Sequence, residues 1–175
     1  MNIINNLNTA IEILLEQKPL VIFQGDSEWG PRALGNRSIL FDARNKDAKN
    51  IVNKFKKREW WRPLAGTILL EHAHDYFDFA SLKESPFMSF AVDAKQKALD
   101  EVPSIVHVDG TCRVQTVTKE QNYNYYNLIK EFYNRTKVPV LLNTSFNIAG
   151  FPIVENFAIL EHTVKNSEFK DIYVP

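Results

Sequence analysis

Apolar residues recur along this chain with two different periods. Helical spacing predicts amphipathic helices over residues 3–14, 48–55 and 125–132, and a last helix over residues 155–164. Continuous apolar runs predict buried strands, which are PLVIFQG at 19–25, LAGTILLE at 64–71, VPVLLN at 138–143 and DIYVP at 171–175. Helices and strands therefore alternate, which is typical of an α/β sheet protein.

The middle of the chain has a weaker pattern. SPFMSFAVD, at 85–93, is expected to be extended, and AKQKALDE, at 94–101, fits either a helical turn or an exposed loop. PSIVHVDGTCRVQTV, at 103–117, predicts two strand segments joined by a tight turn at Asp109 and Gly110. The expected architecture is a single domain over residues 1–175, with a mixed sheet and helices packed against it.

Composition limits the cell compartment and the classes of partner that we expect for this protein. The 21 Lys and Arg residues equal the 21 Asp and Glu residues, so no overall charge attracts nucleic acid or membrane, and any attraction for anions has to be local. The lone cysteine, Cys112, cannot form an internal disulfide, which favours a reducing compartment. Residues 1–18 have neither a basic start nor a long apolar run, so we expect a cytoplasmic protein without membrane attachment.

The first candidate site is EWGPRALGNRSIL, at 28–40, where Arg32 and Arg37 alternate with Gly30 and Gly35. Glycine allows sharp turns and close approach of the backbone to a ligand. The segment is either a plain surface loop or one wall of an anion site, and its composition alone favours neither.

The second candidate is the basic segment NKFKKREWWRPLAG, at 53–66. Lysines on the exposed face of the preceding helix are expected to be solvated. Lys56, Arg58 and Arg62 differ because Trp60, Trp61 and Pro63 lie among them, which implies partial burial. The two tryptophans are expected to lie in the core or in a pocket wall. A buried cation needs an anion, and the planar guanidinium of arginine matches phosphate or carboxylate.

The third candidate is the run that follows the apolar strand at 138–143. Asn143, Thr144, Ser145 and Asn147 carry short hydrogen-bonding side chains at the strand's carboxyl end, where open α/β sheets bind ligands. A turn or helix cap uses the same residue types, so both interpretations stay open.

Several familiar sites are absent from the sequence. There is no Walker loop, Rossmann fingerprint or nucleophile elbow. His72, His74 and Asp75 match no standard metal spacing, so we predict no metal site there. His107 and Asp109 fit a turn with a partly buried histidine, and Cys112 is expected to pack in a strand.

Taken in order, FQGDSEWGPRALGNRSIL, FKKREWWRPLAGTIL, SPFM, HVDGTCRVQTV and PVLLNTSFNIAGFPIV resemble the carboxyl-terminal domain of the nodulation-type O-carbamoyltransferases. The resemblance covers nearly the whole chain from Phe23. A more distant resemblance is to the YrdC family of threonylcarbamoyl-adenylate synthases, through a Lys-x-Arg before Pro-Leu and a Thr-Ser-x-Asn-x-x-Gly. The matching residues here are Lys56, Arg58, Pro63, Leu64, Thr144, Ser145, Asn147 and Gly150.

The resemblance implies a YrdC-like twisted sheet with a concave basic face. It implies binding of carbamoyl phosphate and of ATP with Mg²⁺, and formation of carbamoyl adenylate. Lys56, Arg58 and Arg113 would clamp the phosphate and carbamoyl groups, Ser145 and Asn147 would orient the reacting group, and Arg32 and Arg37 would line the nucleotide phosphates.

In the relatives, an amino-terminal domain of the actin-like ATPase class transfers the carbamoyl group to a hydroxyl of the acceptor. That domain is absent from this sequence, so we expect a separately encoded half that works with a partner subunit, a fragment, or a stand-alone domain adapted to another use. The alternative function is a non-catalytic nucleotide or RNA binding module, which the neutral total charge disfavours.

Overall fold

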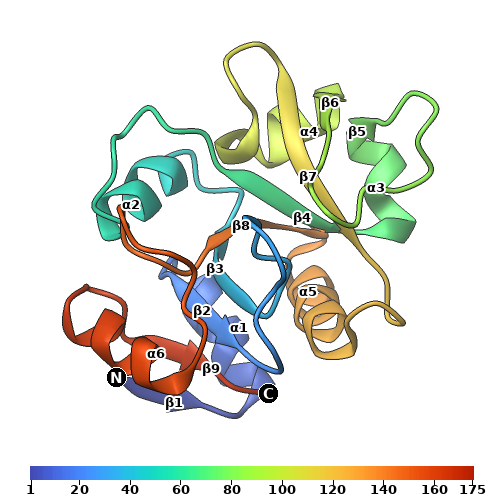
Figure 1. Ribbon diagram of the computed structural model, residues 1–175. Helices are drawn as coiled ribbons and strands as arrows, with labels where there is room; N and C mark the ends of the chain where they lie inside the picture. Colours follow the sequence, from blue (N-terminus) through green and yellow to red (C-terminus); the bar gives the residue numbers. More distant parts are fainter.

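The structure, a computed structural model, describes residues 1–175 and is built on a single mixed sheet (Figure 1). Its order is β1-β9-β2-β3-β8-β4-β7-β6-β5. The strands are β1 (Asn2–Ile4), β2 (Leu20–Phe23), β3 (Arg37–Asp42), β4 (Ala65–Leu69), β5 (Phe77–Asp78), β6 (Ala91–Ala94), β7 (Thr111–Val117), β8 (Val140–Ser145) and β9 (Asp171–Tyr173).

Six α-helices and one short 3₁₀ helix connect these strands. They are α1 (Leu7–Leu15), α2 (Ala48–Phe55), α3 (Leu70–Tyr76), α4 (Gln96–Glu101), η1 (Pro103–Ile105), α5 (Tyr123–Thr136) and α6 (Phe157–Lys165). Asn6, Asn122 and Asn156 cap α1, α5 and α6, each accepting a hydrogen bond from the backbone N–H three residues later. None of the helices has the length and apolar character needed to cross a membrane.

The helices divide between the two faces of the sheet. Buried residues of α1 and α5 pack with Leu40 and Leu141 in one core, whereas those of α2, α3, α4 and α6 pack with Ile39 and Leu142 in the other. Strand β8 contributes to both cores and is fully buried from Val140 to Asn143, as expected for an apolar strand in the middle of a sheet.

Strand β8 is antiparallel to both of its neighbours, β3 and β4, and β4 is parallel to β7. The carboxyl end of β8 therefore lies beside the amino ends of β4 and β7. Asn143 of β8 pairs with Ala65 of β4. Because Gly66 pairs with Val114 of β7, the preceding residue of β7, Arg113, lies level with Ala65 and Asn143 across the sheet. Polar residues at the end of β8 and a cation at the start of β7 are thus brought together.

Most predicted elements are confirmed, and five assignments are wrong. Segment 85–93 is a strand only from Ala91, because residues 86–87 form a turn and Met88 has a φ of +54°. Ile3 belongs to β1, because the Asn6 cap starts the helix at Leu7. Strand β3 lies inside the segment predicted as a loop or site wall, and α3 begins inside the predicted strand at 64–71. The segment before Asp109 is the helix η1 and not a strand, because Pro103 starts a turn; β7 pairs instead with β6.

Residues 94–101 adopt the helical alternative, as α4. The tight turn at Asp109 and Gly110 is present, with a hydrogen bond from the Gly110 N–H to the His107 carbonyl at 3.0 Å. The sheet is mixed and carries helices on its faces, as the alternation of elements predicted.

Gly35 packs directly against α5. It has a φ of +109°, and a Cβ there would lie within 3.0 Å of three ring atoms of Tyr125. Gly30, in the same loop, also has a positive φ but has no atom within 4 Å of the corresponding position. The close approach of loop and helix therefore depends on Gly35.

We predict that Gly35→Ala lowers the free energy of unfolding more than Gly30→Ala does. Both changes strain the backbone by about 1–2 kcal/mol, but only Gly35→Ala adds overpacking of about 1–3 kcal/mol. Urea unfolding followed by circular dichroism measures both variants. Equal losses of stability in the two variants would show that the contact with Tyr125 is not constraining.

Candidate active site

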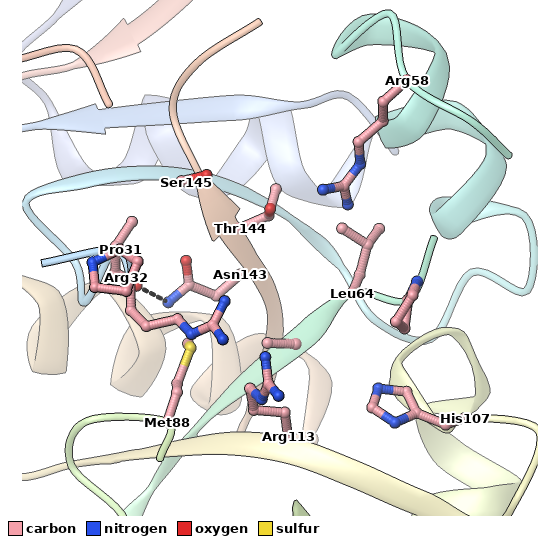
Figure 2. Close-up of a pocket in the computed structure, with 13 residues that line it drawn as sticks. Pro31, Arg32, Arg58, Leu64, Met88, His107, Arg113, Asn143, Thr144 and Ser145 are labelled. Carbon is pink, nitrogen blue, oxygen red and sulfur yellow. Dashed lines mark hydrogen bonds between the residues drawn. The ribbon is translucent and has the colours of Figure 1, made fainter. Parts of the chain in front are cut away.

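A cavity of about 170 Å³ opens at the carboxyl end of β8 (Figure 2). Three arginines line it and no carboxylate does. Its lining residues are Pro31, Arg32, Ala33, Arg58, Pro63, Leu64, Ala65, Met88, His107, Arg113, Asn143, Thr144 and Ser145. In the absence of any negative side chain, the site is suited to an anion.

Each arginine reaches the cavity from a different part of the fold. Arg32 comes from the loop between β2 and β3, Arg58 from the turn after α2, and Arg113 from the start of β7. Arg32 is exposed, while Arg58 and Arg113 are half-buried. The three cations therefore surround one space, although they are far apart in the sequence.

Burial lowers the pKa of two of these guanidinium groups, those of Arg58 and Arg32. Burial, with a further contribution from Arg62, lowers the pKa of Arg58 to about 10. The pKa of Arg32 is also lowered, mainly by partial desolvation of its guanidinium in the cavity wall and then by the charge of Arg113. A bound anion would offset these penalties, because an opposite charge favours the protonated form.

Two buried guanidinium nitrogens in this cavity have no hydrogen-bond partner, namely Arg58 Nη2 and Arg113 Nε. Arg58 is held in place by Asn53, whose Oδ1 accepts from Arg58 Nε at 2.5 Å. Buried donors that stay unpartnered cost free energy, so each unpaired nitrogen indicates a group that a ligand would supply.

Lys56 lies behind the cavity and does not line it. The residue is 2% exposed, and its ammonium donates to the Ser145 carbonyl, to Ser145 Oγ at 3.2 Å and to Asn147 Oδ1 at 2.8 Å. Its carbonyl accepts from the Ala149 N–H at 2.9 Å. Lys56 thus fixes the loop after β8, and burial followed by the charge of Arg58 holds its pKa well below 10.5.

Asn147 is part of the same loop anchor. Its Oδ1 also accepts from Ser145 Oγ at 2.7 Å, and its Nδ2 donates to the Phe151 carbonyl at 2.6 Å. Asn147 does not line the arginine cavity, but with Ser145 it lines a neighbouring one of about 430 Å³. The two cavities share Pro31 and Ser145, so they are adjacent.

Arg37 was expected to line nucleotide phosphates, and the structure does not bring it into either cavity. It is 3% exposed, and its guanidinium donates to four main-chain carbonyls, those of Gln24, Gly25, Asn36 and Glu155. The guanidinium also lies 3.8 Å from the centre of the Phe23 ring. With its donors occupied, Arg37 fastens loops together and has none left for a phosphate.

Arg62 also lies outside the cavity, where it pairs with Glu59 at 2.6 Å and both side chains are about half exposed.

The expected burial of Trp60 and Trp61 is wrong, since they are 72% and 58% exposed. The reason is Asn53, whose Nδ2 donates to the carbonyls of Trp60 and Arg62 from inside the turn and so directs these side chains outward.

Four contributors were not singled out as site residues from the sequence. Met88 and His107 line the cavity, and Met88 has a φ of +54°. Glu28 Oε1 accepts from the backbone N–H groups of Leu34, Asn36 and Arg37, and so shapes the loop that carries Arg32. Gln115 bonds the same loop from β7. Met88 and His107 fell inside the family motifs SPFM and HVDGTC, the one signal that could have identified them.

The remaining histidines and the cysteine pack against other side chains. The ring of His72 lies 4.5 Å from that of Tyr133, and the ring of His74 lies 5.1 Å from that of Phe79. His107 is half-buried in its turn, as expected, and Cys112 is buried in β7, where burial raises the pKa of its thiol to about 12. None of these arrangements gathers three potential metal ligands.

Comparison with solved structures identifies the fold. Full-length HypF in its phosphate- and nucleotide-bound form superposes with a TM-score of 0.61 at 15% identity, covering 92% of this chain and 20% of that one. A variant of P. abyssi Sua5 superposes with a TM-score of 0.62 at 12% identity, covering 99% of this chain and 49% of that one. The expected YrdC-like fold is confirmed.

Comparison of sequences identifies the family. The model described as "Carbamoyltransferase C-terminus" matches residues 11–174. Nodulation protein NolNO of Sinorhizobium fredii is 47% identical over 137 residues, which are 77% of this chain and 20% of that protein. Nodulation protein U of Rhizobium tropici is 38% identical over 138 residues, which are 79% of this chain and 24% of that protein.

This chain spans only about a fifth to a quarter of the length of those relatives. The matched region nevertheless includes the strands and loops that build the arginine cavity. Both the length of the match and the identity of the relatives agree with the motifs noted in the sequence. The chain belongs to the carbamoyltransferase C-terminus family.

Proposed function

We propose that this chain binds carbamoyl phosphate and ATP and forms carbamoyl adenylate, which a partner domain would use to carbamoylate a hydroxyl group. The observation that supports this most is the cavity in which Arg32, Arg58 and Arg113 meet without any carboxylate. Family membership supports the carbamoyl group, and the cations suit phosphorylated substrates.

The proposed reaction needs water for its atoms to balance. Hydrolysis of carbamoyl phosphate releases inorganic phosphate and carbamate. An oxygen of carbamate then attacks the α-phosphorus of ATP, the bond to the bridging oxygen breaks, and pyrophosphate leaves with the electron pair. Both leaving groups are polyanions, so catalysis would consist mainly of positioning them and offsetting their charge.

The guanidiniums of Arg58 and Arg113 would supply these contacts, because each has a buried nitrogen without a partner. The exposed Arg32 would complete the clamp from the loop side. Thr144 and Ser145 line the same cavity and would hydrogen-bond the reacting groups. Lys56 and Asn147 would act as positioning residues, because their polar atoms hold the loop that carries Ser145.

The neighbouring cavity would take the nucleoside part of ATP. Its lining includes Glu28 and Glu155, which disfavour phosphate but can accept hydrogen bonds from ribose hydroxyls or from the amino group of adenine. Because the cavities share Pro31 and Ser145, the phosphates would extend from this site toward the arginines.

The lining of the arginine cavity does not fit a protein-held magnesium ion. Mg²⁺ in such sites usually binds one or two carboxylates together with substrate phosphates. The arginine cavity has no carboxylate. In the neighbouring cavity, Glu28 Oε1 accepts three backbone hydrogen bonds, and Glu28 Oε2 is buried without a partner. We therefore assign no step to a metal ion bound by this chain.

The surface around the cavity suggests where a partner domain would bind. Trp29, Trp60, Trp61 and Phe87 are all strongly exposed, and each lies within two residues of a residue that lines the cavity. Large exposed aromatic groups are typical of interaction surfaces. We propose that the transferring domain of a carbamoyltransferase, in the same or another chain, covers this rim.

The alternative function is a non-catalytic nucleotide or RNA binding module. The exposure of Trp60 and Trp61 favours it, because bases can stack on such rings. The neighbouring cation weighs against it, since Arg62 is paired with Glu59. Titration with single-stranded RNA at low salt separates the two functions, and tight binding there would favour the alternative.

We predict that the purified chain releases pyrophosphate and inorganic phosphate from ATP and carbamoyl phosphate, and that Arg58→Ala lowers kcat/KM by about 10- to 150-fold. One hydrogen bond to a charged group contributes about 1.5–3 kcal/mol. Phosphate and pyrophosphate assays measure the rates, with Arg113→Ala as a second variant.

Arg62→Ala is the matched control, because its side chain belongs to a surface ion pair outside the cavity. Such pairs contribute little, so this variant should retain its rate. The absence of pyrophosphate release by the wild type, or equal rates in all the variants, would contradict the proposed function.

We also predict that the buried ammonium of Lys56 makes stability depend on pH. Its folded-state pKa is lowered below 10.5, so the unfolded chain binds more protons between the two values, and stability rises with pH in that window. In Lys56→Met this rise should be smaller. Urea unfolding at several pH values below 10.5 measures the slope.

The control for this measurement is Lys54→Met, which changes an exposed lysine of α2 and should leave the slope as it is in the wild type. Parallel stability curves for the wild type and Lys56→Met would contradict the assignment. They would mean that the three oxygen acceptors of Lys56 fully offset its burial.

A further inference from the structure

Three buried polar atoms of the cavity-lining residues lack a hydrogen-bond partner: Arg58 Nη2, Arg113 Nε and Asn143 Oδ1. The first two are cationic donors, and the third is a neutral acceptor. A site for phosphate alone would have no use for an acceptor, because a fully ionised phosphate ester has no proton to donate. Asn143 therefore requires a separate explanation.

The orientation of the Asn143 amide is fixed by its surroundings. Its Nδ2 lies 3.2 Å from the Ala33 carbonyl, 2.8 Å from Thr67 Oγ1 and 3.1 Å from Gln115 Oε1. The Ala33 carbonyl can only accept a hydrogen bond. The amino group of Asn143 must therefore face that carbonyl, and a flipped amide would bring two oxygens together.

The same reasoning fixes the neighbouring amide. Gln115 Nε2 donates to the Leu34 carbonyl at 2.9 Å, so Gln115 Oε1 must face Asn143 and Thr67. Thr67 Oγ1 in turn accepts from the hydroxyl of Tyr125 at 2.9 Å. The amino group of Asn143 is therefore taken up by this network. Only its Oδ1 has no partner in the protein and is left for a ligand.

We infer that Asn143 Oδ1 accepts a hydrogen bond from the amino group of the carbamoyl substrate, and that this contact selects carbamoyl over acyl phosphates. The inference rests on the proposed function, and it assigns one residue of that site to substrate specificity. An anion that carries an N–H group, such as carbamoyl phosphate or carbamate, satisfies both the arginine donors and this acceptor. Asn143 lines the cavity, and without such a donor its buried carbonyl oxygen stays unpaired.

Selection would follow from the cost of leaving this oxygen unpaired. Acetyl phosphate has the same shape and charge as carbamoyl phosphate, but it has a methyl group where carbamoyl phosphate has an amino group. With acetyl phosphate bound, Asn143 Oδ1 would face the methyl group of the ligand and would have no hydrogen-bond donor. Sites that hydrogen-bond a substrate N–H or O–H group discriminate strongly against analogues that lack it.

The test compares the affinities of carbamoyl phosphate and acetyl phosphate by calorimetry, at a pH where both are dianions. For the wild type we expect carbamoyl phosphate to bind about 5- to 150-fold more tightly, the range for one unsatisfied buried acceptor. Equal affinities would overturn the inference and leave the anion site intact. If neither compound binds, the proposed function is wrong, and the inference fails with it.

Asn143→Ala tests the residue directly. We expect the ratio of the two affinities to fall toward one, even if both affinities decrease because the network is disturbed. Thr144→Val is the matched control, since it removes a hydroxyl from the next residue of the same strand and should change both affinities in parallel. A ratio that survives in Asn143→Ala but is lost in Thr144→Val would overturn the assignment.

Asn143→Ala can lose its fold, because the side chain bonds to strands β4 and β7 and to the loop at Ala33. Thermal unfolding of the variant detects that outcome, and the comparison of the two ligands on the wild type then decides alone. A merely structural role of Asn143 would lower stability and both affinities without altering their ratio.

Discussion

The hydrogen-bond ladder on both sides of β8 is the constraint on which the site depends. Because β3 and β4 both pair with this strand, its apolar half is buried between the two cores and cannot shift in register. The polar residues that follow, from Asn143 to Ser145, are then held at a fixed position beside the start of β7. A strand at the edge of the sheet could not place them with the same accuracy.

The second constraint is electrostatic. The side chains of Lys56, Arg37 and Arg58 are buried or half-buried, and none of their charged groups has a carboxylate as a hydrogen-bond partner. For Lys56 and Arg37, neutral oxygens of the main chain and of side chains take the place of a counter-ion, so these groups act as structural supports. Arg58 and Arg113 keep unpaired donors, and this difference separates the cations that build the site from those that would bind a ligand.

Much of the fold could be predicted, because most helices and strands have a clear apolar period. Strand β3 could not, since it is buried on both faces and begins with the charged Arg37, so it has neither alternation nor an uninterrupted apolar run. Helix α3 directly continues β4 without a turn residue between them. The local pattern of apolar and polar residues does not indicate where such a strand ends and the helix begins.

Within the site, the motifs contain Arg32, Arg58, Arg113 and the end of β8, which the structure brings together around one cavity. They could not distinguish cations that face the cavity from cations that hold loops, because Lys56 and Arg58 stand two residues apart in one motif. Nor could they predict the outward position of Trp60 and Trp61. That position depends on the side chain of Asn53, which bonds to the carbonyls of the turn and not to any feature of the tryptophans.

The contacts of Arg37 also have an evolutionary consequence. All the hydrogen-bond acceptors of its guanidinium are main-chain carbonyls, which every amino acid possesses. Substitutions at Gln24, Asn36 or Glu155 can therefore preserve these hydrogen bonds. At position 37, no side chain other than arginine supplies five N–H donors in this geometry. Natural drift in the surrounding loops can thus proceed while a single arginine keeps them joined.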